Sequence, residues 1–137
     1  MIKYKITKDF KQVEKARKEV YNINYDSGYY MNLLKEGKIV ALSIYDTDFL
    51  IGSCYVSNSC DTLYIEQIFI KKPLQKQGYG TKLLKCVIDN KELFENYFKT
   101  DISMSRFEPT DEASYALVKK MGYRKTNGVL GTMKKNI

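Results

Sequence analysis

Hydrophobic and polar side chains alternate along residues 2–7, and this period of two predicts a short strand with one buried face. The period becomes helical over residues 8–20, where Phe10, Val13 and Val20 recur on one side. A weaker helical pattern covers residues 27–35 and ends before Gly37. The first part of the chain is therefore expected to form one strand and two helices.

Three hydrophobic runs follow, over residues 38–46, 49–57 and 62–71. Short polar turns separate them, and Pro73 ends the last run. Because consecutive strands with such short connections pair as antiparallel neighbours, these runs are expected to form a meander.

The clearest helical pattern of the chain covers residues 75–93, where Leu83, Leu84 and Val87 share one face. Residues 96–105 then predict a fifth strand. A last helix is expected over residues 110–121, because Asp111 offers a capping oxygen at its start and Gly122 can end it.

Residues 123–126 and 129–134 are expected to close the chain as a hairpin around the turn Asn127-Gly128. The order of elements predicts a mixed α+β fold, and the absence of linkers or repeats predicts one domain over residues 1–137.

Composition narrows the chemistry that the chain can perform. It has no histidine, which excludes Ser-His-Asp and Cys-His sites, and a helical zinc motif of the His-Glu type. The three cysteines, Cys54, Cys60 and Cys86, show no metal-binding or disulfide pattern and are assigned to packing, so no metal is expected. Without a leader or an apolar run long enough to span a bilayer, the chain is expected to be cytoplasmic and to have no membrane partner.

The net charge of +7 raises the question of nucleic acid binding. All but three of the 23 basic residues are lysines, and they are spread over the whole chain. This distribution favours a solvated basic surface, and a nucleic acid partner is not expected.

The segment over residues 63–84 combines a hydrophobic strand, a short loop and an amphipathic helix that begins at two closely spaced glycines, Gly78 and Gly80. A helix start presents unpaired N–H groups and the positive end of the helix dipole, which suits an anion. The glycines alone fit a tight turn equally well. A dinucleotide fingerprint needs a further glycine at Leu83, and a phosphate-binding P-loop needs Gly-Lys-Ser/Thr where this chain has Gly80-Thr81-Lys82.

The hexapeptide Gln75-Lys76-Gln77-Gly78-Tyr79-Gly80 resembles the Gln/Arg-Xaa-Xaa-Gly-Xaa-Gly/Ala signature of the GNAT superfamily of acyl-CoA-dependent N-acetyltransferases. The helix over residues 111–123, which ends in Gly122-Tyr123, is similar to a second signature of that family. The order of elements from Ile2 onward also matches, so the resemblance covers most of the chain.

The resemblance implies a GNAT-type fold, in which a mostly antiparallel sheet is flanked by helices and splayed between the fourth and fifth strands to hold acetyl-CoA. It implies that backbone amides near the glycines bind the diphosphate, and that Gln75 stands at the signature position often held by arginine. Lys76 and Lys82 fit either added charge around the phosphates or a solvated helix face. The amides are those of Gln77, Gly78, Tyr79, Gly80 and Thr81. It further implies that the main chain of Ile68, Phe69 and Ile70 pairs with the pantetheine arm.

The family often carries a glutamate general base at the position of Glu66, nine residues before Gln75. Such a base is needed because an alkylamine with a pKa of about 10 is protonated at neutral pH. Burial in a hydrophobic strand would raise the pKa of a carboxyl toward a useful range, and the alternative is a solvent-facing or lysine-paired glutamate. A backbone N–H near Phe69 or Ile70 is expected to polarise the thioester oxygen.

This chain departs from the family at two positions. Val118 stands where the family commonly has a tyrosine that protonates the departing thiolate, and Tyr115, one turn earlier, is the candidate substitute. Asp111 replaces a frequent asparagine near the start of the same helix.

Two functions therefore follow from the resemblance. The first is an N-acetyltransferase that moves an acetyl group from acetyl-CoA to a primary amine by direct attack in a ternary complex. The second is a non-catalytic acyl-CoA binder or sensor on the same scaffold. The acceptor pocket is expected from residues 22–37 and 127–135, and the tyrosines Tyr21, Tyr25, Tyr29 and Tyr30 fit either that pocket or packing. Both a monomer and a homodimer are compatible with the sequence.

Overall fold

The computed structural model describes residues 1–126 and 132–137. Among them, seven strands form one sheet in the order β1-β2-β3-β4-β5-β7-β6. The strands are β1 (Ile2–Ile6), β2 (Val40–Asp46), β3 (Phe49–Ser59), β4 (Thr62–Ile70), β5 (Met104–Phe107), β6 (Arg124–Lys125) and β7 (Met133–Asn136). The helices are α1 (Phe10–Val20), α2 (Tyr29–Lys35), the 3-10 turn η1 (Lys72–Leu74), α3 (Tyr79–Asp89), α4 (Lys91–Phe98) and α5 (Glu112–Lys120).

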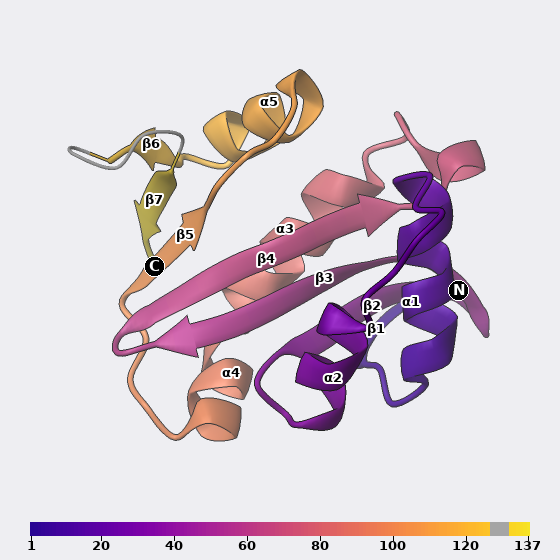
Figure 1. Ribbon diagram of the computed structural model, residues 1–137. Coiled ribbons are helices and arrows are strands. Elements are labelled where there is room, and N and C mark those ends of the chain that lie inside the picture. The colour runs from indigo at the N-terminus through magenta and orange to yellow at the C-terminus, as the bar shows by residue number, and fades with distance from the viewer. Residues whose placement is uncertain (127–131) are drawn as a thin grey trace.

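Helices cover both faces of the sheet (Figure 1). On one face, Val13 and Ala16 of α1 and Leu34 of α2 pack against Tyr55 and Phe69 of the central strands. On the other face, apolar side chains of α3, α4 and α5 form the larger core cluster with the sheet; they are Leu83, Leu84, Val87, Phe94 and Val118. The expected α+β fold with a mostly antiparallel sheet is therefore confirmed.

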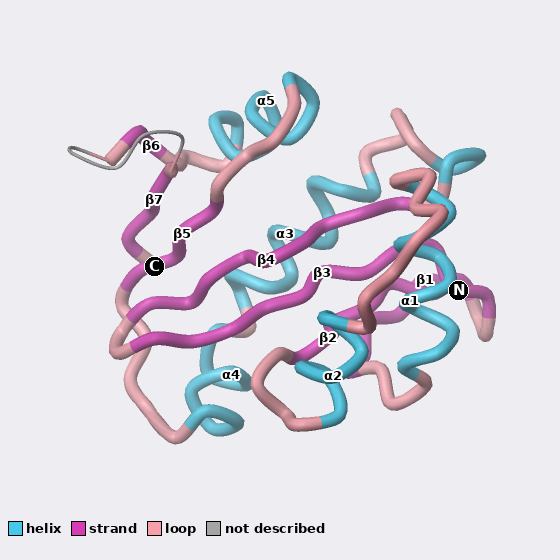
Figure 2. The backbone as a smooth tube through the Cα atoms, in the orientation of Figure 1, coloured by secondary structure: helices cyan, strands magenta, loops and turns pink. Residues whose placement is uncertain are grey.

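The sheet opens between β4 and β5, which form its one parallel pair among the described strands. Their pairing runs from Thr62 with Met104 to Ile65 with Phe107 and stops there, although β4 continues to Ile70. Figure 2 shows the two strands diverging beyond this point, β5 toward α5 and β4 toward the end of α1. The splay expected between the fourth and fifth strands is thus present.

The predictions for residues 75–105 were partly wrong. The helix expected over 75–93 is two helices, because α3 ends at Asn90, whose side-chain amide donates to Cys86 O at 2.8 Å. The strand expected over 96–105 begins only at Met104, since residues 91–98 are helical. Aromatic residues with high strand propensity misled the sequence interpretation: Phe94 and Phe98 lie four residues apart, which is a helical repeat, and Phe94 is fully buried.

The C-terminal hairpin is shifted along the chain from its expected position. Strand β7 covers Met133–Asn136 and pairs with β5 and β6, whereas the prediction placed it over residues 129–134. The predicted turn Asn127-Gly128 lies outside the described residues. None of the helices in the described part of the chain combines the length and apolar character that a membrane crossing requires.

Candidate active site

A cavity of about 420 Å³ occupies the opening between β4 and β5. Its walls come from the end of β4, the loop that leads into α3, the segment from Phe107 to the first turns of α5, and the end of α1 at Tyr21. All of the residues expected to hold acetyl-CoA line it except Gln77, whose side-chain amide donates to Pro73 O at 3.4 Å. The topology thus brings the hexapeptide and the strand edge to one place.

Helix α3 begins in this cavity with Gly78 as its N-cap residue. Gly78 has a φ of 86°, a left-handed conformation that favours glycine, and its first helical bond runs from Lys82 N–H to Gly78 O at 3.1 Å. The N–H groups of Tyr79, Gly80 and Thr81 belong to the first turn and so have no intrahelical acceptor. The local geometry therefore supplies a cluster of backbone donors at the cavity wall.

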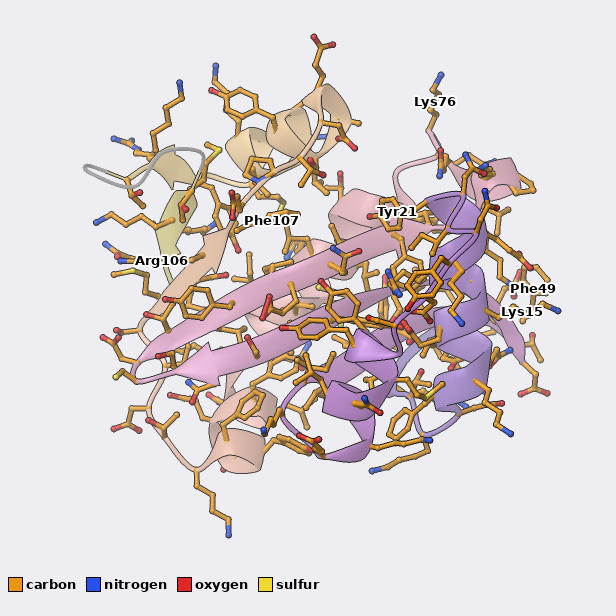
Figure 3. The ribbon with its side chains drawn as sticks, viewed as in Figure 1. Lys15, Tyr21, Phe49, Lys76, Arg106 and Phe107 are labelled. Carbon is orange, nitrogen blue, oxygen red and sulfur yellow. The ribbon has the colours of Figure 1, made fainter. Side chains whose placement is uncertain are left out.

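The space around these glycines is open. A Cβ atom at Gly78 would meet no heavy atom within 4 Å, and one at Gly80 would lie 3.7 Å from Leu117 Cδ2, an ordinary contact. The left-handed φ thus explains why residue 78 is a glycine. Residue 80 has no left-handed φ, and crowding within the protein does not require a glycine there either. Lys76 also lines the cavity but points away from the body of the protein (Figure 3), and Lys82 Nζ lies 5.5 Å from the Tyr79 ring centroid.

The main chain of β4 presents alternate residues to the opening. Lys71 N–H donates to Ile51 O of β3 at 2.9 Å, so Phe69, two residues earlier, also faces β3, where it is paired with Ser53. The peptide groups of Ile68 and Ile70 consequently face the cavity. Of the three residues expected to pair with pantetheine, Phe69 turns its main chain to β3 instead.

Both carbonyls on this free edge already accept a hydrogen bond from a side chain. The Gln75 amide donates to Ile70 O at 2.9 Å, and the Tyr21 hydroxyl donates to Ile68 O at 3.0 Å. Figure 3 shows Tyr21 beside β4, with Phe107 of β5 across the opening. The sequence does not decide whether Tyr21 lines a pocket or packs in the core, because no local pattern indicates that the end of α1 reaches this edge.

Glu66 lies at a β-bulge in β4. Its neighbours Ile65 and Gln67 pair with adjacent residues of β3, Val56 and Tyr55, so Glu66 has no partner on that strand. The Glu66 side chain lines the cavity and accepts a hydrogen bond from Ser57 Oγ at 3.0 Å. Of the two alternatives that the sequence leaves open for Glu66, a buried and a solvent-facing side chain, the structure has the solvent-facing one, because the bulge leaves the residue exposed.

Asp111 caps α5 as expected, whereas Tyr115, the candidate substitute for the family's tyrosine, lies away from the cavity. Tyr115 is half-buried outside the cavity lining, and Lys125 Nζ lies 6.0 Å from its ring centroid. Val118 is 0% exposed in the core. Asp111 lines the cavity and caps α5, since its carboxylate accepts a hydrogen bond from Ser114 N–H at 2.7 Å.

The hydroxyl groups of Tyr21 and Tyr30 keep their protons at neutral pH. Burial raises the pKa of Tyr21, and the Asp111 carboxylate raises it further. Burial also raises the pKa of Tyr30, followed by the charge of Glu66. These hydroxyls can therefore serve as hydrogen-bond donors.

Comparison with known proteins identifies the family. A sequence model described as the Acetyltransferase (GNAT) family matches residues 3–123. The chain belongs to the GNAT acetyltransferase family. No curated protein matches this GNAT sequence.

Solved structures share the fold of this GNAT chain at low sequence identity. The ribosomal-protein-S18-alanine N-acetyltransferase from Escherichia coli aligns with a TM-score of 0.80 at 14% identity, covering 100% of this chain and 94% of that one. NAA60 of Arabidopsis thaliana, solved with a bisubstrate analogue, gives a TM-score of 0.74 at 16% identity, with coverages of 100% and 98%. A GNAT acetyltransferase from Elizabethkingia anophelis with acetyl-CoA bound gives 0.73 at 16%, with coverages of 99% and 98%.

A buried polar network fixes the helix that brings Tyr21 to the GNAT cavity. Glu14 of α1 accepts hydrogen bonds from Arg17 Nε at 2.7 Å and Nη2 at 3.1 Å, and from the Tyr55 hydroxyl of β3 at 2.8 Å. Arg17 also lies over the Tyr30 ring, with Cζ 4.6 Å from the centroid. Because Tyr21 follows Arg17 by one turn, this network sets the position of the tyrosine relative to β4.

Proposed function

We propose that this GNAT protein transfers an acetyl group from acetyl-CoA to a primary amine by direct attack in a ternary complex. The observation that carries the proposal is a single cavity with the first-turn amides of α3 at one end and the free edge of β4 along its side. Backbone donors at a helix start suit a diphosphate, and a free strand edge suits the two amides of pantetheine. The open space at Gly78 fits such a ligand.

The acidic residues of the cavity favour a cationic amine as the acceptor. Glu66, Glu108 and Asp111 line the cavity, in a protein whose net charge is +7. Carboxylates attract an ammonium group before it loses its proton. We infer that Glu66 accepts that proton, directly or through water, because it lies at the free edge of β4 and is open to solvent.

The strand edge can also stabilise the charge that develops during transfer. The N–H groups of Ile68 and Ile70 face the opening, and we infer that one of them donates to the thioester oxygen as the amine attacks the carbonyl carbon. The carbon–sulfur bond then breaks and CoA leaves as a thiolate, which is a tolerable leaving group because a thiol has a pKa of about 8.5.

The cytoplasm is the compartment that best fits this activity. Cys54, Cys60 and Cys86 are all unpaired, as expected of a protein in a reducing environment.

Among residues 1–126 and 132–137, no group of three or more Cys, Asp or Glu side chains is arranged to hold a metal ion. The proposed reaction needs only acetyl-CoA and the amine.

Release of CoA distinguishes the enzyme from a non-catalytic acyl-CoA binder. The non-catalytic function is the one favoured by Val118 and by the position of Tyr115. Purified protein is mixed with acetyl-CoA and a set of primary amines, and free thiol is measured with time. We expect release that depends on both protein and amine, and no acetylated protein in the mass spectrum when amine is omitted. Tight binding of acetyl-CoA without amine-dependent release would instead establish the binder.

The substitution Glu66→Gln tests the proposed base. It keeps the shape of the side chain and removes the proton acceptor, so we expect kcat to fall about 100-fold or more, with acetyl-CoA affinity unchanged. Glu112→Gln, which changes an exposed glutamate outside the cavity lining, is the matched control and should keep wild-type kcat. A Glu66→Gln variant with wild-type turnover would remove Glu66 from the reaction.

A further inference from the structure

The hydrogen bond from the Tyr21 hydroxyl to Ile68 O joins two residues far apart in the chain, unlike the hydrogen bond from Gln75 to Ile70 O on the same strand edge. Gln75 reaches Ile70 O from the loop directly after β4, five residues along the chain. Tyr21 reaches Ile68 O from the end of another element, 47 residues away, and its side chain is 40% exposed. A tyrosine hydroxyl from α1 thus holds a main-chain acceptor that faces the cavity.

This acceptor is one that the proposed cosubstrate needs. Ile68 offers both its N–H and its carbonyl to the opening, the pair of groups that an added extended segment uses on a strand edge. The two amides of pantetheine have the same donors and acceptors as such a segment. An amide N–H that approaches Ile68 O from the cavity meets the position now taken by the Tyr21 hydroxyl.

We propose that Tyr21 is a catalytic residue of this protein: it holds the Ile68 carbonyl in the free protein, yields it to pantetheine, and then donates to the thioester sulfur. The inference rests on the proposed function. In this proposal α1 supplies the hydrogen-bond donor to the thioester sulfur. Val118 of α5, which stands where the family commonly has a tyrosine, has no such donor.

The role needs a hydrogen-bond donor and no proton transfer. Negative charge grows on sulfur as the carbon–sulfur bond breaks, and a directed O–H group stabilises it. Because burial and the Asp111 carboxylate raise the pKa of Tyr21, the hydroxyl keeps its proton while the thiolate leaves. The amine's own proton passes to Glu66 or to water.

The end of α1 is anchored on both sides of Tyr21, so displacement of the hydroxyl requires only side-chain rotation. Tyr21 N–H donates to Arg17 O at 3.1 Å, within the helix end that the buried Glu14 network fixes. The next residue, Asn22, accepts a hydrogen bond from Lys72 Nζ at 2.8 Å, which ties α1 to the loop after β4. A hydroxyl released from Ile68 therefore stays beside the strand edge.

The substitution Tyr21→Phe separates this role from a structural one. We expect kcat to fall about 100-fold, the effect of losing one donor to developing charge. We also expect acetyl-CoA to bind no more weakly, and up to about tenfold more tightly by calorimetry, because the ligand no longer displaces a hydroxyl. Tyr97→Phe, which removes a hydroxyl from a tyrosine of α4 that is 45% exposed and lies outside the cavity lining, should match wild type in both measurements.

Two results would overturn the proposal: a Tyr21→Phe variant with wild-type kcat, or one whose acetyl-CoA affinity falls along with kcat, as a structural role predicts. Failure of the proposed function is distinguishable, because wild-type protein would then release no CoA with any amine. In that case the affinity of Tyr21→Phe for acetyl-CoA still tests whether the hydroxyl occupies the site of the ligand.

Discussion

Replacing Glu14 with alanine is expected to lower the free energy of unfolding by about 3–5 kcal/mol. Glu14 is 1% exposed and holds Arg17 and Tyr55 through three hydrogen bonds, so its removal leaves a buried guanidinium and a buried hydroxyl without their main acceptor. Domains of this size have a total stability of about 5–15 kcal/mol. The loss is measured by urea denaturation followed by circular dichroism.

Glu19→Ala is the matched control for Glu14, because it removes an exposed glutamate from the same helix. Its unfolding free energy should stay within about 0.5 kcal/mol of wild type. Equal stability of the Glu14 and Glu19 variants would contradict the view that the buried network anchors α1 to the sheet.

Replacing Gly78 with valine is expected to weaken acetyl-CoA binding by about 100-fold. A β-branched residue disfavours the φ of 86° at this N-cap, so the chain relaxes and the first-turn amides of α3 lose their common direction. Loss of two hydrogen bonds to a charged diphosphate costs about 3 kcal/mol or more, which corresponds to the expected factor. Calorimetric titration with acetyl-CoA measures it directly.

Two glycines provide controls for this variant. Gly28 is the N-cap of α2, has a φ of 76°, and a Cβ atom there would meet no heavy atom within 4 Å, so Gly28→Val meets the same strain away from the cavity. Gly80→Ala adds a methyl group at an ordinary contact distance from Leu117. Both should retain wild-type affinity, and an equal loss in Gly28→Val would mean that strain, and not the helix start, weakens binding.

Much of the fold could be predicted from local patterns. The meander β2-β3-β4 and the helix α3 each carry a strong period in sequence, and short turns fix the pairing of the strands. Helix α4 was missed because Tyr97 and Phe98 have high strand propensity, although the spacing of four residues between Phe94 and Phe98 is a helical signal. The position of β7 depends on pairing with β5, a contact between distant residues.

The candidate site likewise contains one feature that local sequence predicts and others that depend on the three-dimensional fold. The hexapeptide predicts a helix start with backbone donors because loop, glycines and helix are contiguous in the chain. Two features arise only in three dimensions: the bulge that exposes Glu66, and the end of α1 that brings Tyr21 to Ile68. A one-residue bulge and a contact over 47 residues have no local signature in the sequence.

A crystal structure of the protein with bound CoA would show whether the start of α3 holds the diphosphate. We expect diphosphate oxygens within hydrogen-bond distance of the amide nitrogens of Tyr79, Gly80 and Thr81, and pantetheine along the edge formed by Ile68 and Ile70. A diphosphate bound away from the start of α3, or a helix start closed by the protein's own side chains, would contradict this expectation.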